Sequence, residues 1–274
     1  MLPEDELVDL IARAAGSSRE VLVGIGDDAA VLAGGLVAST DILVDGVHFD
    51  SSRMDARAIG HRAAAANLSD MAAMGARPLC LLAAVGLPGE FAGVGELAEG
   101  LASHGVPVAG GDLSRAPLLV VSVTALGRAE RPVLRSGGRP GDLLVVSGPL
   151  GGQAAAGYTL PITPRLAEGA ALARFATAMI DISDGIATDA RRLADASGAG
   201  ALVRLGDLPR AAGATVEQAA AGGEDYELLA AVPPGASLPG WATVIGRLRE
   251  QPGLVLVDPT GAHRPDLVGY DHFA

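Results

Sequence analysis

Six short segments of this chain place acidic residues inside or beside turns rich in small residues, and several directly follow an apolar run typical of a β-strand. The six segments are Gly24–Ala30, Ser39–Asp41, Asn67–Asp70, Gly110–Asp112, Asp181–Gly185 and Gly222–Asp225. Asp and Gly are common in turns and Asp caps helices, so each segment taken alone could be only a turn. Open α/β sheets bind ligands at the loops that follow their strands. Six such segments in one chain therefore favour a sheet fold that gathers carboxylates at strand ends.

The rest of the sequence alternates short apolar runs with stretches that repeat apolar residues at helical spacing. Helices are predicted at residues 3–15, 55–74, 95–104, 165–176 and 186–196, with a short helix after the glycines at 148–152. Strands are predicted at residues 21–25, 36–40, 42–44, 79–87, 106–109, 118–126, 142–147, 179–182, 201–205, 226–232, 242–245 and 254–257. This alternation predicts an α/β or α+β class in each half of the chain.

The chain is slightly long for a single hydrophobic core, with 274 residues of which 49% are hydrophobic. Residues 128–141 are rich in Arg, Pro and Gly, which is typical of a connection between domains. We therefore predict two domains, residues 1–130 and residues 131–274.

Composition argues against several partners and locations for this chain. The formal net charge of −12 argues against nucleic acid as a partner, because binding to phosphate backbones depends on basic side chains. No apolar run approaches the roughly 18 residues of a membrane-spanning helix, and the acidic start of the chain is unlike a signal peptide. The single cysteine, Cys80, allows no disulfide framework, and its apolar surroundings predict a buried structural thiol. We expect a cytoplasmic protein without a membrane span.

The chain contains no lysine, because all 20 of its basic residues are arginine. The P-loop and protein-kinase motifs both need a lysine and are absent, and no histidine stands at zinc-ligand spacing. Phosphoryl transfer requires mainly positioning and charge neutralisation. Magnesium prefers oxygen ligands, and the adjacent carboxylates of Asp27 and Asp28 repel each other unless a cation lies between them. The pattern therefore indicates phosphate chemistry that depends on arginine and carboxylate-bound magnesium.

These motifs, in this order, resemble the thiamine-monophosphate kinase family, within the ATP-binding superfamily that includes aminoimidazole ribonucleotide synthetase and selenophosphate synthetase. The resemblance runs from Gly24 to Phe273, and its most specific parts are Gly222–Leu228 and Gly269–Phe273. It implies an aminoimidazole ribonucleotide synthetase-like architecture, with an N-terminal ATP/metal-binding sheet domain used for dimerisation and a C-terminal mixed-sheet α/β domain that completes the site. The implied activity is phosphorylation of thiamine monophosphate to thiamine diphosphate, the last step of thiamine diphosphate biosynthesis. The γ-phosphoryl group of ATP would pass directly and in line, in a homodimer that binds ATP, Mg²⁺ and thiamine monophosphate.

The resemblance also assigns residues by motif. Implied metal ligands are Asp28, Ser39, Thr40, Asp41, Asp70, Asp112, Asp181 and Asp184. The nucleotide would meet Gly111, Asp112, Arg135 and Ser183, and the thiamine phosphate would meet His48, Glu224 and Tyr270. Asp70, Asp184 and Arg135 would be catalytic.

Four of these assignments have a simpler structural alternative. Asp184 could cap the helix at 186–196, and Arg135 could be a solvated charge of the linker. His48 could be a structural histidine and Tyr270 a core aromatic.

Two departures from the family pattern and two alternative functions remain open. The segments at 88–105 and 153–165 are short, and no adenine-contacting residue is assigned in the first of them. A sister synthetase is one alternative, although the chain lacks the N-terminal Cys and Lys of selenophosphate synthetase, and aminoimidazole ribonucleotide synthetase lacks the terminal Gly-Tyr-Asp-His-Phe. A non-catalytic nucleotide- or metal-binding regulator is the other, and a broken metal motif would favour it, but none of the six is broken.

Overall fold

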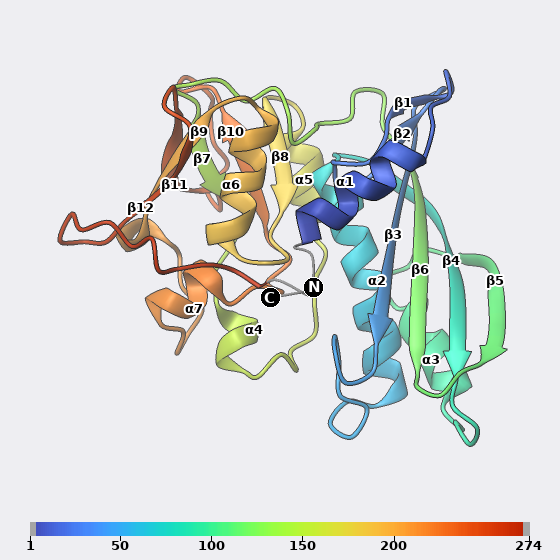
Figure 1. The fold of residues 1–274 in the computed structure, drawn as a ribbon. Helices are drawn as coiled ribbons and strands as arrows, with labels where there is room; N and C mark the ends of the chain where they lie inside the picture. The colour runs from blue at the N-terminus through green and yellow to red at the C-terminus, as the bar shows by residue number, and fades with distance from the viewer. Residues whose placement is uncertain (1–3, 271–274) are drawn as a thin grey trace.

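The computed structural model describes residues 4–270 and contains two six-stranded sheets, one in each half of the chain (Figure 1). The amino-terminal half contains α1 (Glu4–Ala14), β1 (Val21–Val23), β2 (Ala30–Leu32), β3 (Leu36–Val44), α2 (Ala56–Ala73), β4 (Arg77–Leu87), α3 (Val94–Leu101), β5 (Val108–Arg115) and β6 (Val120–Arg128). The carboxy-terminal half contains β7 (Leu143–Val146), α4 (Gly152–Ala155), α5 (Leu166–Leu172), β8 (Ala178–Asp181), α6 (Ile186–Ala196), β9 (Gly200–Arg204), the 3₁₀ helix η1 (Leu205–Asp207), α7 (Val216–Ala221), β10 (Leu228–Val232), β11 (Thr243–Arg249) and β12 (Gly253–Val257). The predicted α/β class is confirmed, and both sheets are mixed.

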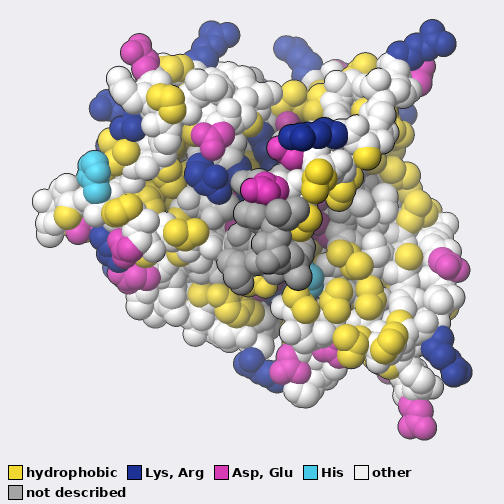
Figure 2. All heavy atoms as spheres, viewed as in Figure 1, with side chains coloured by type: hydrophobic (Ala, Val, Ile, Leu, Met, Phe, Trp, Pro, Cys, Tyr) yellow, Lys and Arg dark blue, Asp and Glu magenta, His cyan; other side chains and the backbone are white. Residues whose placement is uncertain are grey.

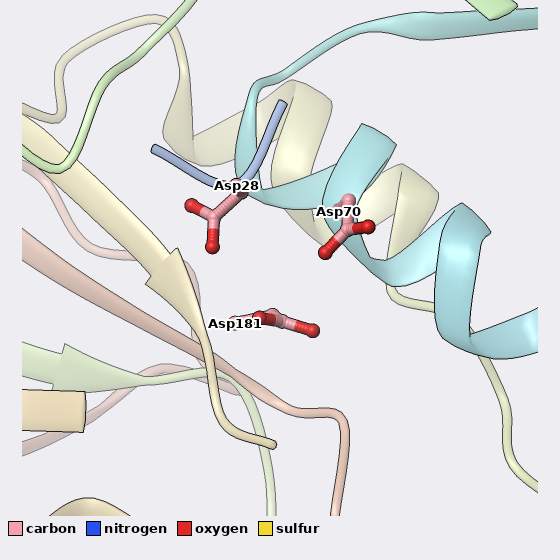
Figure 3. A group of neighbouring side chains, drawn as sticks. All are labelled: Asp28, Asp70 and Asp181. Atoms are coloured by element: carbon pink, nitrogen blue, oxygen red, sulfur yellow. The ribbon is translucent and has the colours of Figure 1, made fainter. Parts of the chain in front are cut away.

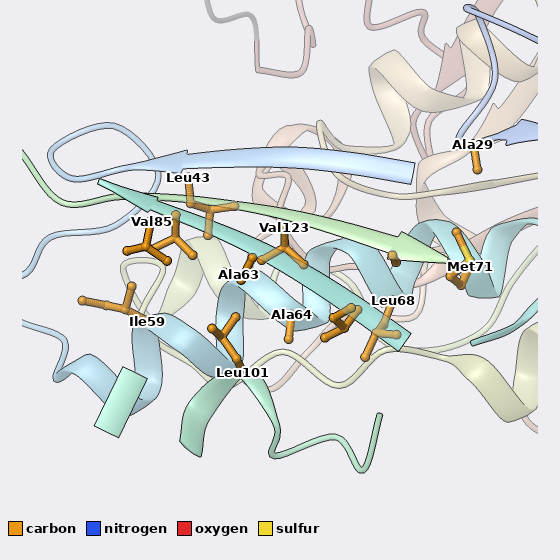
Figure 4. Close-up of a cluster of buried hydrophobic side chains, with 14 of the residues drawn as sticks. Ala29, Leu43, Ile59, Ala63, Ala64, Leu68, Met71, Val85, Leu101 and Val123 are labelled. Atoms are coloured by element: carbon orange, nitrogen blue, oxygen red, sulfur yellow. The ribbon is translucent and has the colours of Figure 1, made fainter. Parts of the chain in front are cut away.

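The first sheet has the strand order β1-β2-β3-β6-β4-β5, in which only β4 and β5 run parallel. Side chains alternate between its two faces, as the pleat of a strand requires. The inward side chains pack against α2 and α3 and form a buried cluster (Figure 4). On the opposite face Ile42 is 55% exposed and Leu82 is 38% exposed. No described residue covers this apolar outer face.

Helices α2 and α3 approach each other closely because two glycines meet at their crossing. A Cβ atom on Gly60 would lie 2.2 Å from the carbonyl oxygen of Leu97, and one on Gly100 would lie 2.1 Å from that of Arg57. The side chain of Asp55 accepts a hydrogen bond from the backbone N–H of Ala58 (2.7 Å) and so caps the start of α2.

The second sheet has the order β12-β9-β11-β7-β10-β8, and only β12 and β9 are parallel. Helix α6 packs against it, and α5 packs against α2 of the other half, where a Cβ atom on Gly169 would lie 2.2 Å from the carbonyl oxygen of Ala72. Ala72 and Ala73 belong to the same buried cluster as Leu172 and Met179. The two halves are therefore joined by a shared apolar core through α2.

The structure corrects several predicted elements. The predicted strands 36–40 and 42–44 are the single strand β3, and the predicted strand 106–109 is β5, which starts at Val108 and extends to Arg115. The segment Gly110–Asp112 is therefore part of a strand and not a turn. Position 111 requires glycine, because a Cβ atom there would lie only 1.8 Å from the carbonyl oxygen of Ala83.

Three elements have no counterpart in the sequence prediction: β2, the short 3₁₀ helix η1 and α7. Strand β2 is only three residues long and depends on pairing with β1 and β3. Helix α7 was detectable from a capping box, in which the side chains of Thr215 and Gln218 bond each other's backbone N–H.

Three further predictions can be compared with the described residues. Cys80 is half-buried, because it lies on the outer side of β4, so the prediction of a buried thiol is wrong. Residue 3 of the first predicted helix, and Asp271, His272 and Phe273 of the terminal motif, lie outside the described residues. Within residues 4–270, no helix is long and apolar enough to cross a membrane.

Candidate active site

A pocket of ≈ 1240 Å³ lies between the two halves of the molecule. It is lined by β3, the loops that flank it and α2 from the amino-terminal half, and by α6 and the loops at residues 157–159, 181–184 and 222–226 from the carboxy-terminal half. Arginine and acidic side chains lie around the line where the halves meet (Figure 2).

Three carboxylates converge in this pocket from three separate elements. Asp28 precedes β2, Asp70 lies in the last turn of α2, and Asp181 ends β8. One oxygen of each lies within 4.8 Å of the others (Figure 3). Asp28 and Asp181 are buried, and among the described residues Oδ2 of Asp28 has no hydrogen-bond partner. An unpaired buried carboxylate oxygen among other carboxylates is a place for a cation.

Asn67 explains how α2 presents Asp70 to this cluster. Its side chain is fully buried, donates to the carbonyl oxygen of Ala63 (3.1 Å) and accepts from the backbone N–H of Asp41 (3.2 Å). The hydroxyl of Ser39 donates to the backbone oxygen of Asn67 (3.4 Å). The Asn-Leu-Ser-Asp segment therefore ties α2 to β3, so that Asp41 and Asp70 face the same pocket.

Burial and mutual repulsion raise the pKa values of these carboxyl groups. Burial, together with Asp28, raises the pKa of Asp27 to about 6 and that of Asp41 to about 6. Burial and the neighbouring carboxylates raise the pKa values of Asp70 and Asp181 well above the usual range. Protons or a metal ion must neutralise such a cluster, and an all-oxygen donor set suits Mg²⁺.

Arg135 supplies positive charge at the same place. Its Nε and Nη2 donate to Oδ1 of Asp28 (3.1 and 2.6 Å), and its backbone N–H donates to Oδ2 of Asp27 (3.1 Å). Burial acts to lower the pKa of the guanidinium, but Asp28 and other carboxylates raise it on balance. Arg135 is therefore part of the pocket and not a solvated linker charge.

Asp184 also lies in the pocket but does not cap α6. The N-cap is Gly185, and the buried carboxylate of Asp189 accepts from the backbone N–H groups of Asp184 (3.1 Å) and Gly185 (3.0 Å). The carboxylate of Asp184 is paired with Arg192 instead. Burial and the charge of Asp184 raise the pKa of Asp189 to about 7. Sequence reasoning missed Asp189 and Arg192, although an acidic residue in the first turn of a helix is a recognised signal.

The three residues predicted to contact the thiamine phosphate line another part of the same pocket. The ring Nδ1 of His48 accepts from the backbone N–H of Val44 (3.1 Å), and Glu224 pairs with Arg62. Tyr270 is 49% exposed, so it is not a core aromatic, and its backbone N–H donates to the carbonyl oxygen of Asp184 (3.0 Å).

Two predicted residues are not brought to this pocket. Gly111 and Asp112 lie on β5, at the edge of the first sheet opposite β1, and border a separate cavity of ≈ 360 Å³ beside α3. All the other predicted site residues line the large pocket; they are Asp28, Ser39, Thr40, Asp41, His48, Asp70, Arg135, Asp181, Ser183, Asp184, Glu224 and Tyr270.

The chain is similar in sequence to proteins of known function. The model of the family described as AIR synthase related protein, N-terminal domain, matches residues 26–129. This match places the first half of the chain in the AIR synthase-related class, and the two mixed sheets with a carboxylate-lined pocket between them agree with it. Thiamine-monophosphate kinase of Mycobacterium tuberculosis (strain CDC 1551 / Oshkosh) is 37% identical over 94% of this chain and 88% of its own length. The chain belongs to the thiamine-monophosphate kinase family.

Other relatives agree with this placement. Thiamine-monophosphate kinase of Escherichia coli (strain K12) is 34% identical and covers 96% of this chain and 95% of its own length. The solved structure of AaThiL complexed with AMPPCP and TMP has a TM-score of 0.89 at 31% identity, covering 99% of this chain and 97% of that chain. E. coli HypE, a hydrogenase maturation protein, shares the fold alone, with a TM-score of 0.69 at 22% identity over 97% of this chain and 98% of its own.

Proposed function

We propose that this chain transfers the γ-phosphoryl group of ATP directly and in line to the phosphate of thiamine monophosphate, giving thiamine diphosphate and ADP. The observation that carries the proposal is the buried cluster of Asp28, Asp70 and Asp181 beside Arg135. It concentrates negative charge in a pocket that contains no lysine, so it requires cations before it can accept phosphates.

The residues that would hold Mg²⁺ are those whose oxygen atoms face the pocket. Asp28, Asp70 and Asp181 form the centre of this candidate magnesium site, and Asp41 and Asp184 line the same pocket. Magnesium bound there would neutralise charge on the transferring phosphoryl group and on both flanking oxygens.

Direct transfer agrees with the groups the pocket offers. The acceptor phosphate already carries negative oxygens at neutral pH, so it needs no strong general base. Arg135 donates through a planar fork that suits phosphate oxygens as well as it suits the carboxylate of Asp28.

The acceptor ring would be recognised by His48, Glu224 and Tyr270. The thiazolium ring of thiamine monophosphate carries a fixed positive charge. A carboxylate and an aromatic face attract such a cation, and Glu224 and Tyr270 provide one of each in the pocket.

Gly111 and Asp112 could meet the nucleotide only if a second subunit brings them to the pocket. They lie on the edge strand β5, beside the uncovered apolar outer face of the first sheet. We therefore propose a homodimer in which these outer faces pack together. Each subunit would offer its β5 edge to the site of the other.

The test is incubation of the protein with ATP, Mg²⁺ and thiamine monophosphate, followed by chromatography of the nucleotides and thiamine phosphates. We expect one ADP for each thiamine diphosphate, and little turnover of free thiamine because it lacks the acceptor phosphate. Equal turnover of thiamine and its monophosphate would overturn the proposal. Nucleotide binding with no turnover of any acceptor would instead favour a regulator.

A further inference from the structure

Arg62 lies beneath the floor of the pocket, on the same face of α2 as Asp70. Residues 62, 66 and 70 follow one another at intervals of four and so share a helix face. Ala66 and Asp70 line the pocket, whereas Arg62 is only 2% exposed and does not. Eight residues of helix place Arg62 about 12 Å from Asp70 along the axis, toward the helix start.

The buried guanidinium of Arg62 forms an ion pair with Glu224. Arg62 belongs to the amino-terminal half and Glu224 to the carboxy-terminal half, so the pair crosses the junction that forms the pocket. Glu224 lines the pocket with 25% of its side chain exposed, and the guanidinium is hidden behind it. A ligand in the pocket therefore meets the carboxylate and not the arginine.

The backbone of Glu224 is held in a conformation that residues other than glycine rarely adopt. Its φ is +57°, and Gly223 and Tyr226 have φ of +66° and +51°. The backbone N–H of Glu224 donates to the carbonyl oxygen of Ser183 (2.6 Å), and that of Tyr226 donates to Ile182 (2.9 Å). The loop after β8, which follows Asp181, thus holds the loop of Glu224 in place.

With this backbone fixed, the direction of the Glu224 carboxylate depends on its side-chain partner across the junction. Among the described residues, Nη1 of Arg62 has no hydrogen-bond partner. A buried guanidinium without a counter-charge is strongly unfavourable, so Arg62 and Glu224 hold each other in one arrangement.

We propose that Arg62 is a positioning residue for acceptor recognition, which orients the Glu224 carboxylate toward the cationic ring of thiamine monophosphate. This inference rests on the proposed function, because it concerns the acceptor of that reaction. Arg62 acts through Glu224 and touches no reacting atom.

The experiment is a double-mutant cycle on binding, which separates this role from general stabilisation. Calorimetry in Mg²⁺ buffer would measure the Kd of thiamine monophosphate and, separately, of ATP for the unaltered protein, Arg62→Met, Glu224→Gln and the double variant. We expect Arg62→Met to raise the Kd of thiamine monophosphate about tenfold or more and to leave the Kd of ATP within about twofold. In the Glu224→Gln background, Arg62→Met should add little, because the group it positions is already altered.

Two further variants keep the test sound. Arg62→Lys retains the charge without the planar fork and should recover part of the lost affinity while it stays folded. Arg57→Met on the same helix removes an exposed ion pair with Glu99 and should leave both Kd values unchanged. Circular dichroism and the binding stoichiometry report the folded fraction of each variant.

Two outcomes would overturn the inference. One is an equal loss of affinity for ATP and thiamine monophosphate in Arg62→Met and Arg62→Lys. The other is full additivity of Arg62→Met with Glu224→Gln. An unaltered protein that does not bind thiamine monophosphate at all would instead remove the proposed function.

Discussion

Asp70 has surroundings that are unusual for an acid needed only for folding. Asp70 lies in the last turn of α2 within 4.8 Å of both Asp28 and Asp181, where burial and these neighbours raise its pKa. A structural acid in a protein core would be paired with a base or capping a helix, and Asp70 is surrounded mainly by other acids. Its charge is therefore better suited to a ligand than to the fold.

Replacing Asp70 with Asn should separate catalysis from stability. The substitution keeps the shape and removes one ligand charge in a site without lysine, so turnover at saturating Mg²⁺ should fall about 100-fold or more, roughly 3 kcal/mol of barrier. The thermal midpoint without Mg²⁺ should not fall and should rise if anything, because clustered like charges repel. Asp184→Asn should lower turnover similarly, but it also removes the ion pair with Arg192 and so should not raise the thermal midpoint.

The matched control is Asp207→Asn, which removes one exposed carboxylate that is paired with Arg204 and does not line the pocket. It should leave turnover unchanged. An Asp70→Asn protein that unfolds much earlier but keeps near-normal turnover would mean that Asp70 is structural and the metal assignment wrong.

The raised pKa values also predict how the metal-free protein responds to pH. The pKa values of Asp27 and Asp41 rise from 3.8 to about 6 through burial and the charge of Asp28, so the folded state binds protons that the unfolded chain has released. Proton binding by these two carboxyl groups therefore stabilises the folded state. This stabilisation is fully present below about pH 4 and is lost as pH rises through about 6. Exposed acids such as Asp258 and Asp266, whose hydrogen bonds lower their pKa values, act only at more acidic pH.

Without metal, the thermal midpoint should therefore be higher at about pH 5.5 than at about pH 7.5. Excess Mg²⁺ should reduce this difference, because the metal replaces the protons. Differential scanning calorimetry at both pH values, with and without Mg²⁺, is the measurement. A metal-free midpoint that increases with pH over this range would contradict the electrostatic reading of the pocket.

At the scale of elements, α2 connects the core, the pocket and the junction between the halves. It packs on the first sheet and on α5 and carries Arg62, Asn67 and Asp70. Its position relative to α3 depends on Gly60 and Gly100, which let the two backbones come into contact.

A pair of glycine substitutions on α3 tests this close approach. Gly100→Ala should lower the free energy of unfolding by about 1–3 kcal/mol, because its methyl group would overlap the carbonyl oxygen of Arg57. Gly95→Ala on the same helix meets nothing within 4 Å and should be neutral or stabilising by up to about 1 kcal/mol. Urea unfolding of both variants compares them, and equal midpoints would show that the crossing tolerates a wider separation.

At the scale of the whole molecule, the uncovered outer face of the first sheet predicts a second copy of the chain. Exposed Ile42 on β3 and Leu82 on β4, the two strands that flank β6, would be buried in a homodimer. Light scattering should give twice the chain mass of 27.3 kDa at micromolar concentration. Leu82→Asp, outside the lining of the large pocket, should shift the mass to that of the monomer and lower turnover, because Gly111 and Asp112 would leave the partner's site.

The control for that experiment is Val268→Asp, an exposed position outside the first sheet. It should leave the dimer intact. A monomer mass for the unaltered protein across this concentration range would contradict the dimer proposal and leave Gly111 and Asp112 without a role at the pocket.

Much of the local structure could be predicted from the sequence. Helix α6 begins and ends at the predicted residues 186 and 196, because its apolar repeat is regular and Gly198 follows it. The acidic motifs were also recognisable, since residue type and spacing are local properties. Strand β2 was not recognisable, because three residues carry no periodicity and their strand conformation depends on pairing with β3.

Only the tertiary structure decided which segments meet. Asp28, Asp70 and Asp181 come together because a loop of the first sheet, a helix end and a strand end of the second sheet converge at one junction. Asp112 looked equivalent to them in sequence, but the order β3-β6-β4-β5 carries it to the far edge of the first sheet. Local sequence sets the conformation of each segment, whereas strand order and packing between helices set the distances between segments. These distances decide which of several similar motifs share a site.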